Sequence, residues 1–271
     1  MNNEHNIRDL DLLYFDSSKL LNEIMTNSLD QDILNAIVAG ISKIEECWQG
    51  EDANAQLHKI VSIYNSLVEV RNYIGNTSVF LSTLASSYRE AQISNGAALD
   101  NFTLLQYTEM NKMEENIHKS STVYISNDLL DVCTLFNEIA GKISKLNTSI
   151  HDTSESIFSN WIIGDDNRNY AIDLFKMIST NLTNVEEQLS EMSGVIQKAV
   201  QNYKASLSKV SSIPSLSSMN QKTEMQTSVV EEHEMISHIE NNLKENRTVS
   251  ADFNNQLIEE VKKVLVKEGI L

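Results

Sequence analysis

The stretch EECWQGED, residues 45–52, decides the fold of this chain. Apolar residues spaced three and four apart precede it, and a second run with the same spacing follows it. The first run comprises Leu10, Leu13, Leu20, Leu21, Ile24, Ile33, Leu34, Ile37, Val38, Ile41, Ile44 and Trp48. The second comprises Ala53, Leu57, Ile60, Tyr64, Leu67, Ile74, Leu81, Leu84 and Tyr88. This is the period of amphipathic helices, so residues 1–96 are predicted to form an antiparallel helical hairpin.

The turn between the two predicted helices has residues suited to ending one helix and starting the next. Gly50 is expected to adopt the left-handed conformation that ends the first helix, and Asp52 is expected to cap the second. The first helix should span about forty residues, with a bend near Ser28 to Asp30.

A second Trp turn, WIIGDD at residues 161–166, lies between two further apolar runs. Trp161 corresponds to Trp48, Gly164 to Gly50 and Tyr203 to Tyr88, at offsets that drift only from 113 to 115 residues. The sequence therefore predicts an internal duplication, with a second helical hairpin over residues 123–206.

Composition supports an all-α fold. The chain has 271 residues but only 8 Gly and 1 Pro, too few for the many turns of all-β or Rossmann-like architectures. We predict two long antiparallel hairpins packed as an elongated four-helix bundle, plus a short helical C-terminal tail. Residues 97–122 are expected to be a linker helix or an extension of the next helix, residues 207–219 a Ser/Pro linker, and residues 220–271 the helical tail.

The charge of the chain limits its partners. It has 38 acidic residues against 21 Lys and Arg, a formal net charge of −17, which argues against nucleic acid and against strong binding to anionic membranes. Protein partners are expected instead. No amino-terminal signal and no membrane-spanning stretch is present in the sequence, so we expect a protein made in the cytoplasm that would need another route to be secreted.

No motif predicts an enzyme, and no catalytic, metal-binding or cofactor-binding residues are proposed. Cys47 and Cys133 lie far apart in sequence and are expected to be buried thiols. The stretch EHEMISH, residues 232–238, is not a zinc motif, because its histidines are five residues apart and so do not share a helix face as in HExxH.

The two turns resemble the WXG family, small helical hairpins associated with type VII (ESX) secretion. Trp48-Gln49-Gly50 matches the motif, whereas Trp161-Ile162-Ile163-Gly164 is one residue longer. The resemblance covers roughly residues 7–92 and 123–206. Because the first turn keeps the tight motif and the second has an extra residue, Trp48 is expected to be the better candidate for recognition. Trp161 is expected to serve packing alone.

Family members pair as antiparallel dimers of hairpins, so two hairpins in one chain resemble a fused, intramolecular dimer. The family's export signal combines the Trp-x-Gly turn with Tyr-x-x-x-Asp/Glu at the far end of a second helix. Here Tyr88 and Tyr203 keep the tyrosine but lack the acid. One literal match, Tyr124 to Asp128, is better explained as a helix start.

The resemblance implies a non-enzymatic protein that is exported cargo or the companion of a larger effector. Its partners would be another WXG-like protein, that effector or a secretion ATPase. The alternative is a helical membrane-active toxin component or subunit, against which stands the lack of an apolar hairpin long enough to insert.

Overall fold

The computed structural model describes residues 7–114, 123–162 and 166–211. Helices make up 82% of it, which confirms the all-α class. The chain divides into two compact units, Met1–Ile196 and Gln197–Leu271. The second unit is described only over residues 197–211, which are helical. The packing below is that of the first unit.

The first long helix runs from Leu10 to Cys47 in three consecutive parts. These are α1 (Leu10–Lys19), η1 (Leu20–Leu34) and α2 (Asn35–Cys47). Asp9 caps its start, because the Asp9 carboxylate accepts hydrogen bonds from the amides of Asp11 and Leu12 at 2.9 and 3.0 Å.

The middle part, η1, is a π-helix, and it contains the positions where we expected a bend. Two hydroxyls follow its wider turn: Thr26 Oγ1 donates to the carbonyl of Leu21 at 2.9 Å, and Ser28 Oγ to that of Glu23 at 3.0 Å. Each reaches five residues back, the spacing of the π-helical ladder. Four of the buried apolar residues of η1, Leu20, Ile24, Leu29 and Ile33, are spaced four and five apart, and Leu21, Met25 and Leu34 are buried beside them.

The first turn differs in detail from the prediction. Helix α2 ends before Trp48, and β1 (Trp48–Gln49) pairs antiparallel with β2 (Tyr124–Ile125). The expectation that Gly50 ends the first helix is wrong, because Trp48 takes the C-cap position of α2. Gly50 instead takes the N-cap position of α3 (Glu51–Ser94), with φ of 133°. The expected cap at Asp52 is therefore wrong, since that residue lies within the first turn of α3. A positive φ of this size favours glycine, so the turn requires Gly50.

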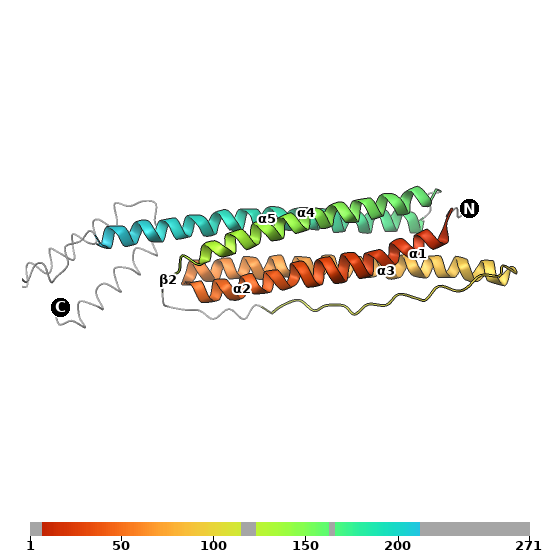
Figure 1. Ribbon diagram of the computed structural model, residues 1–271, viewed down its shortest axis with the longest axis horizontal. Coiled ribbons are helices and arrows are strands. Elements are labelled where there is room, and N and C mark those ends of the chain that lie inside the picture. The colour runs from red at the N-terminus through yellow and green to blue at the C-terminus, as the bar shows by residue number, and fades with distance from the viewer. Residues whose placement is uncertain (1–6, 115–122, 163–165, 212–271) are drawn as a thin grey trace, which may run out of the picture. The chain divides into compact units, whose positions relative to one another are not determined.

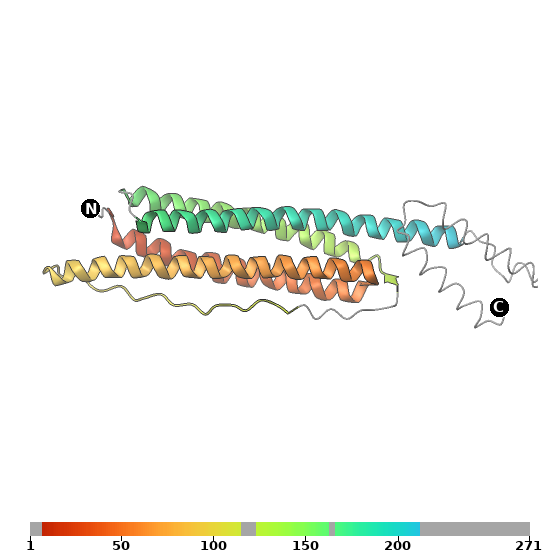
Figure 2. The same cartoon turned by 180° about the vertical axis from the view of Figure 1, so that it is seen from behind.

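Four long helical segments bury their apolar stripes against one another (Figures 1 and 2). Helix α3 packs on α1, η1 and α2, and the first long helix also packs on α4 (Leu129–Asn160). Helix α5 (Asp166–Ser211) contacts α4 through Phe158 and Phe175, whose ring centroids are 5.7 Å apart. Cys47 and Cys133 are both buried thiols, as predicted.

Residues 97–114 are extended rather than helical, which corrects the expectation of a linker helix or helix extension. They run back along α3 in both views (Figures 1 and 2). The reason is reach. The 44 residues of α3 span about 66 Å, and the chain must return along this length so that β2 can pair with β1. A helix over residues 97–122 would reach only about 39 Å, whereas an extended chain of that length exceeds 80 Å.

Helix α5 continues to Ser211, so the Ser/Pro linker expected from residue 207 cannot begin there. The predicted tail, residues 220–271, and the EHEMISH stretch lie outside the described residues. Within the described ranges, no helix combines the length and apolarity needed to cross a bilayer.

Helices α2 and α4 approach each other closely at Gly40, but Gly141 of α4 lies in open space. A Cβ on Gly40 would lie 2.7 Å from Cε1 of the fully buried Phe136, whereas a Cβ on Gly141 would meet nothing within 4 Å. We expect Gly40→Ala to lower the free energy of unfolding by about 1 to 2 kcal/mol, because overpacking exceeds the gain in helix propensity. Gly141→Ala should raise it by up to about 1 kcal/mol. Urea denaturation of both variants checks this, and equal stabilisation by the two would contradict the close approach.

Candidate functional site

The first Trp turn is closed by the start of the second repeat. Trp48 pairs with Ile125 in the β1–β2 ladder, and the Ser126 amide donates to the carbonyl of Cys47 at 2.8 Å. We call this pairing of residues 47–49 with residues 124–126 the first clasp.

The second Trp turn is closed in the same way by the start of the first repeat. Trp161 forms an antiparallel bridge with Ile7, and the Arg8 amide donates to the carbonyl of Asn160 at 3.1 Å. We call this pairing of residues 7–9 with residues 160–161 the second clasp. In both clasps the residue after the bridged isoleucine donates to the residue before the tryptophan. The two clasps are therefore equivalent, and each repeat closes the turn of the other.

The clasps differ at the residue before the tryptophan. Asn160 adds two side-chain hydrogen bonds to the second clasp: its Oδ1 accepts from the Asp9 amide at 2.9 Å and its Nδ2 donates to the Asp9 carbonyl at 2.7 Å. The first clasp has Cys47 at this position. Burial, above all, raises the pKa of the Cys47 thiol, and the nearby acids Asp128, Glu46 and Asp131 raise it further while Lys43 opposes them. A thiol with a raised pKa stays neutral and is a poor nucleophile.

Both tryptophans of the predicted site lie inside the protein. Trp48 is 2% exposed and Trp161 is 1% exposed, and neither indole N–H has a hydrogen-bond partner among the described residues. A partner could contact either ring only after a clasp opens. The expected difference, with Trp48 open to recognition and Trp161 used in packing, is therefore not seen in the burial of the two side chains. Gly164 lies outside the described residues, whereas Gly50 is buried at the first turn.

The tyrosines of the predicted site lie on the second helix of each hairpin, Tyr88 on α3 and Tyr203 on α5. Tyr88 is half-buried near the end of α3, and Tyr203 is buried in the second unit, on α5. Tyr124 lies in β2 and is 47% exposed, and Asp128 takes the N-cap position of α4. The literal Tyr-x-x-x-Asp match is thus a helix start, as interpreted from the sequence.

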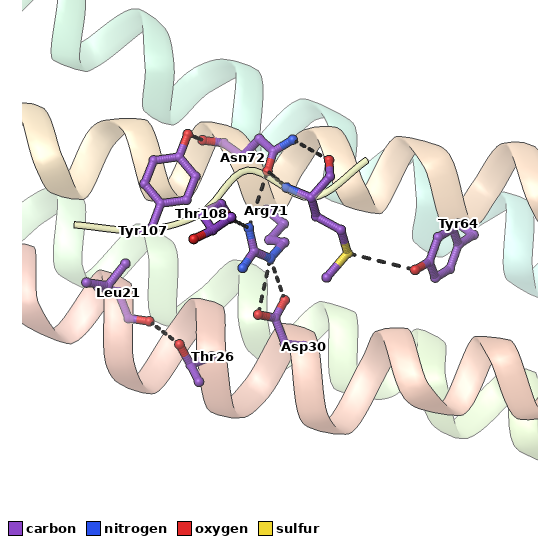
Figure 3. Close-up of polar contacts among 9 residues, drawn as sticks. Leu21, Thr26, Asp30, Tyr64, Arg71, Asn72, Tyr107 and Thr108 are labelled. Carbon is purple, nitrogen blue, oxygen red and sulfur yellow. Dashed lines mark hydrogen bonds and ion pairs between the residues drawn. The ribbon is translucent and has the colours of Figure 1, made fainter. Parts of the chain in front are cut away.

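The structure adds a site that the sequence reading missed, on the face of α3 that binds residues 97–114. We call these residues the strap, and we call the side chains of α3 and α1 that bind them the groove. Figure 3 shows the part of this site around Arg71 and Asn72. Asn72 binds the strap main chain with both amide atoms. Its Oδ1 accepts from the Met110 amide and its Nδ2 donates to the Met110 carbonyl, each at 3.0 Å. Asn65 repeats this at Met113, at 2.7 and 3.1 Å. Two asparagines therefore bind the strap as a neighbouring β-strand would.

A buried arginine ties the strap to the first helix at the same place (Figure 3). Arg71 Nε lies 2.9 and 3.1 Å from the two carboxylate oxygens of Asp30 in η1. Its Nη1 donates to the strap carbonyl of Thr108 at 2.8 Å and to Asn72 Oδ1 at 3.3 Å. The Tyr107 ring fills the space left by Gly75, where a Cβ would come within 2.5 Å of it.

Arg89 plays the same part 18 residues further along α3. It pairs with Asp11 of α1 at 2.9 Å, donates to the strap carbonyl of Asp100 at 3.4 Å, and lies 4.3 Å from the centroid of the Phe102 ring. Phe102 also stacks on Tyr14, with centroids 4.5 Å apart. Eighteen residues are five turns of an α-helix, so both arginines lie on one face of α3.

The signal for this groove in the sequence is weak. Asn65 and Asn72 are seven residues apart, two turns on one helix face, but polar residues at such spacing are common on solvated faces. A stronger indication is the position of Arg71, which follows the apolar Val70. Arg71 lies four residues after Leu67 and three before Ile74, so this charged residue falls on the helix face of the apolar stripe. Its burial could not be read from the sequence, because it depends on Asp30 of another helix.

One carboxylate lies buried between α1 and α4. Asp16 is 4% exposed, and Ser156 Oγ donates to its Oδ2 at 2.7 Å. Burial raises the pKa of Asp16, while the Ser156 hydrogen bond and Lys19 lower it in part. An acid whose pKa is raised on folding binds protons more readily in the folded state than in the unfolded state. Above the raised pKa the buried carboxylate is charged and lowers the stability of the fold. This destabilisation disappears as the pH falls below the pKa and the carboxylate is protonated.

We therefore expect Asp16→Asn, which keeps an acceptor for Ser156, to melt at a higher temperature than the unmodified chain at pH 7. The difference should shrink as the pH falls toward the raised pKa of Asp16, where the unmodified chain gains its proton. Thermal melts from pH 4 to pH 8 check this. A difference that grows toward low pH would contradict the raised pKa.

No group of three or more His, Cys, Asp or Glu residues in the described ranges is placed to hold a metal ion. No family model, no curated protein and no solved structure matches the chain. The likeness to WXG proteins therefore rests on the residues of the two turns.

Proposed function

We propose that the chain is a non-enzymatic binding protein of a type VII (ESX-like) secretion context, built from two WXG-like hairpins that pair within one molecule. It would act as exported cargo or as companion of a larger effector. The observation that carries this proposal is the equivalence of the two clasps. Each Trp turn pairs with the start of the other repeat, as expected of a fused antiparallel dimer.

The same pairing indicates how such a protein would bind its partners. The two repeats already cover each other's apolar stripes, so a partner must use the outer faces of the helices rather than complete the core. The chain carries a net charge of −17, which favours basic partner surfaces.

Export is the experiment that tests the secretion context. The tagged full chain would be made in a bacterium with a type VII system and in the same strain without the secretion ATPase, with a cytoplasmic protein as lysis control. We expect the chain in the medium of the first strain only. Equal amounts in both media would contradict the proposal.

The tyrosines provide a sharper arm of this test. Tyr88 is half-buried and Tyr203 is buried, so Tyr88 is the more accessible of the two for a secretion component. Tyr88→Ala should reduce export more than Tyr170→Ala, a control on α5 with a tyrosine that is 53% exposed. Equal export of the two variants would remove Tyr88 from the recognition site.

A further inference from the structure

The strap is bound mainly through groups that every peptide has. Its main chain receives or donates hydrogen bonds at Asp100, Thr103, Thr108, Met110 and Met113. The partners are side chains of α3 and α1, among them both amides of Asn65 and Asn72. A groove that binds the main chain accepts extended segments of many sequences.

The spacing of the asparagines fits an extended chain. Asn65 and Asn72 are seven residues apart on α3, a rise of about 10.5 Å. They bind Met113 and Met110, three residues apart on the strap, which is about 10 Å of extended chain. Arg71 and Arg89 repeat this match over about 27 Å of helix, against about 26 Å between the strap carbonyls that they bind. Helix and peptide thus stay in register along the groove.

The groove also selects side chains. The half-buried strap residues Tyr107, Met110 and Met113 recur every third position. Phe102 and Leu105 are also three residues apart, and a step of two residues separates Leu105 from Tyr107. Three is the period of an extended polyproline-like peptide, which presents one side chain per turn to a surface. Gly75 supplies the space for the ring of Tyr107. The groove therefore suits aromatic and methionine-sized side chains at three-residue spacing.

The strap itself is an electrostatically poor ligand. It contains Asp100, Glu109 and Glu114 but a single basic residue, Lys112, on a chain whose net charge is −17. That one base pairs with Glu69 on α3. The groove cations Arg71 and Arg89 are each paired with an acid, Asp30 and Asp11. The negative charge of the chain would therefore favour a basic segment of equal shape over the acidic strap.

We propose that this groove binds an extended, basic segment of a partner protein, with aromatic or methionine side chains at every third position, and that the strap is its built-in competitor. A linker between the two hairpins needs only to be long enough to span α3. An extended chain meets this requirement without the hydrogen bonds from Asn65 and Asn72, so these contacts indicate a binding role. The inference concerns the first hairpin and does not depend on the secretion context proposed above.

Peptide binding to the full chain tests this proposal. The probe is a fluorescent peptide of residues 99–114 carrying Asp100→Lys, Glu109→Lys and Glu114→Lys, measured by anisotropy. The variant Phe102→Ala/Tyr107→Ala weakens the strap and leaves the groove side chains intact. We expect it to bind the probe at least about tenfold more tightly than the unmodified chain, since a groove filled by its own strap is available only a fraction of the time.

The groove side is tested on that background. Adding Asn65→Leu/Asn72→Leu removes the four side-chain hydrogen bonds that these residues make to the strap main chain, and it should weaken binding at least about 30-fold. Asn76→Leu, at an exposed asparagine of the same helix, should not weaken binding. The unchanged acidic peptide should bind more weakly than the basic one. Equal affinity of the two peptides would overturn the assignment of a basic partner.

Hydrogen exchange on the unmodified chain provides a readout that needs no variant to fold. Saturating probe should speed exchange of the Met110 and Met113 amides, which donate to Asn72 and Asn65, at least about tenfold. Unchanged exchange at these amides, or probe binding that ignores the asparagine substitutions, would show that the strap is a linker only.

Discussion

Trp161→Ala is expected to lower the free energy of unfolding by about 3 to 5 kcal/mol, and Trp48→Ala by a similar amount. The two side chains are 1% and 2% exposed and are the largest fully buried side chains in the described part of the chain. Removing either indole leaves a cavity beneath a clasp that joins the two repeats. Thermal and urea denaturation measure the loss, which should lower the melting temperature by roughly 6 °C or more.

The matched controls are Trp48→Phe and Trp161→Phe. Phenylalanine keeps most of the ring volume and removes a buried N–H that has no partner in the described structure, so these variants should lose much less stability than the alanine variants. If Trp48→Ala keeps its stability while export or partner binding is lost, the first turn is a recognition element. That result would support the expectation, based on the tighter Trp-x-Gly spacing of the first turn, that Trp48 serves recognition and Trp161 serves packing. It would contradict a packing role for Trp48.

The features predicted well from the sequence are those set by local pattern. Helical periodicity and the scarcity of glycine and proline predicted the all-α class, and the two Trp turns marked where each hairpin reverses. The apolar residues assigned to the two stripes that meet at Trp48 are largely buried. Local sequence suffices here because an amphipathic helix needs only its own residues to define its apolar face.

The features missed are those set by distance and by other segments. The π-helix of η1 follows an apolar spacing of four and five, at Leu20, Ile24, Leu29 and Ile33, which is easily taken for an irregular α-helix. The strap is extended because the return along α3 is too long for a helix of its length, a constraint that appears only once β2 is known to pair with β1. The groove needs Asp30, Arg71 and Met110 together, and no local pattern joins them.

Asp30→Ala is expected to lower the free energy of unfolding by about 2 to 3 kcal/mol, because it leaves the buried Arg71 guanidinium without its carboxylate. The side chain of Arg71 is only 10% exposed and that of Asp30 only 21%. Arg71→Met should lose less, about 1 to 2 kcal/mol, since it also removes the charge that needs a partner. Because these effects share one interaction, the double variant should lose about as much as Arg71→Met alone. Urea denaturation of the three variants measures this cycle, and additive losses would contradict a coupled pair.

The same cycle reports on the strap through Asn72. Its Oδ1 accepts from both Arg71 and Met110, so an Arg71 that has lost Asp30 loosens an amide that holds the strap. Asp30→Ala should therefore speed hydrogen exchange at Met110 more than at Met113, whose partner Asn65 lies two turns away. Asp173→Ala is the control, because it removes an exposed ion pair with Lys176 and should cost less than about 0.5 kcal/mol without changing exchange in the strap. Equally faster exchange at the Met110 and Met113 amides would mean that Asp30 stabilises the hairpin as a whole. The contacts between groove and strap would then open together and not independently.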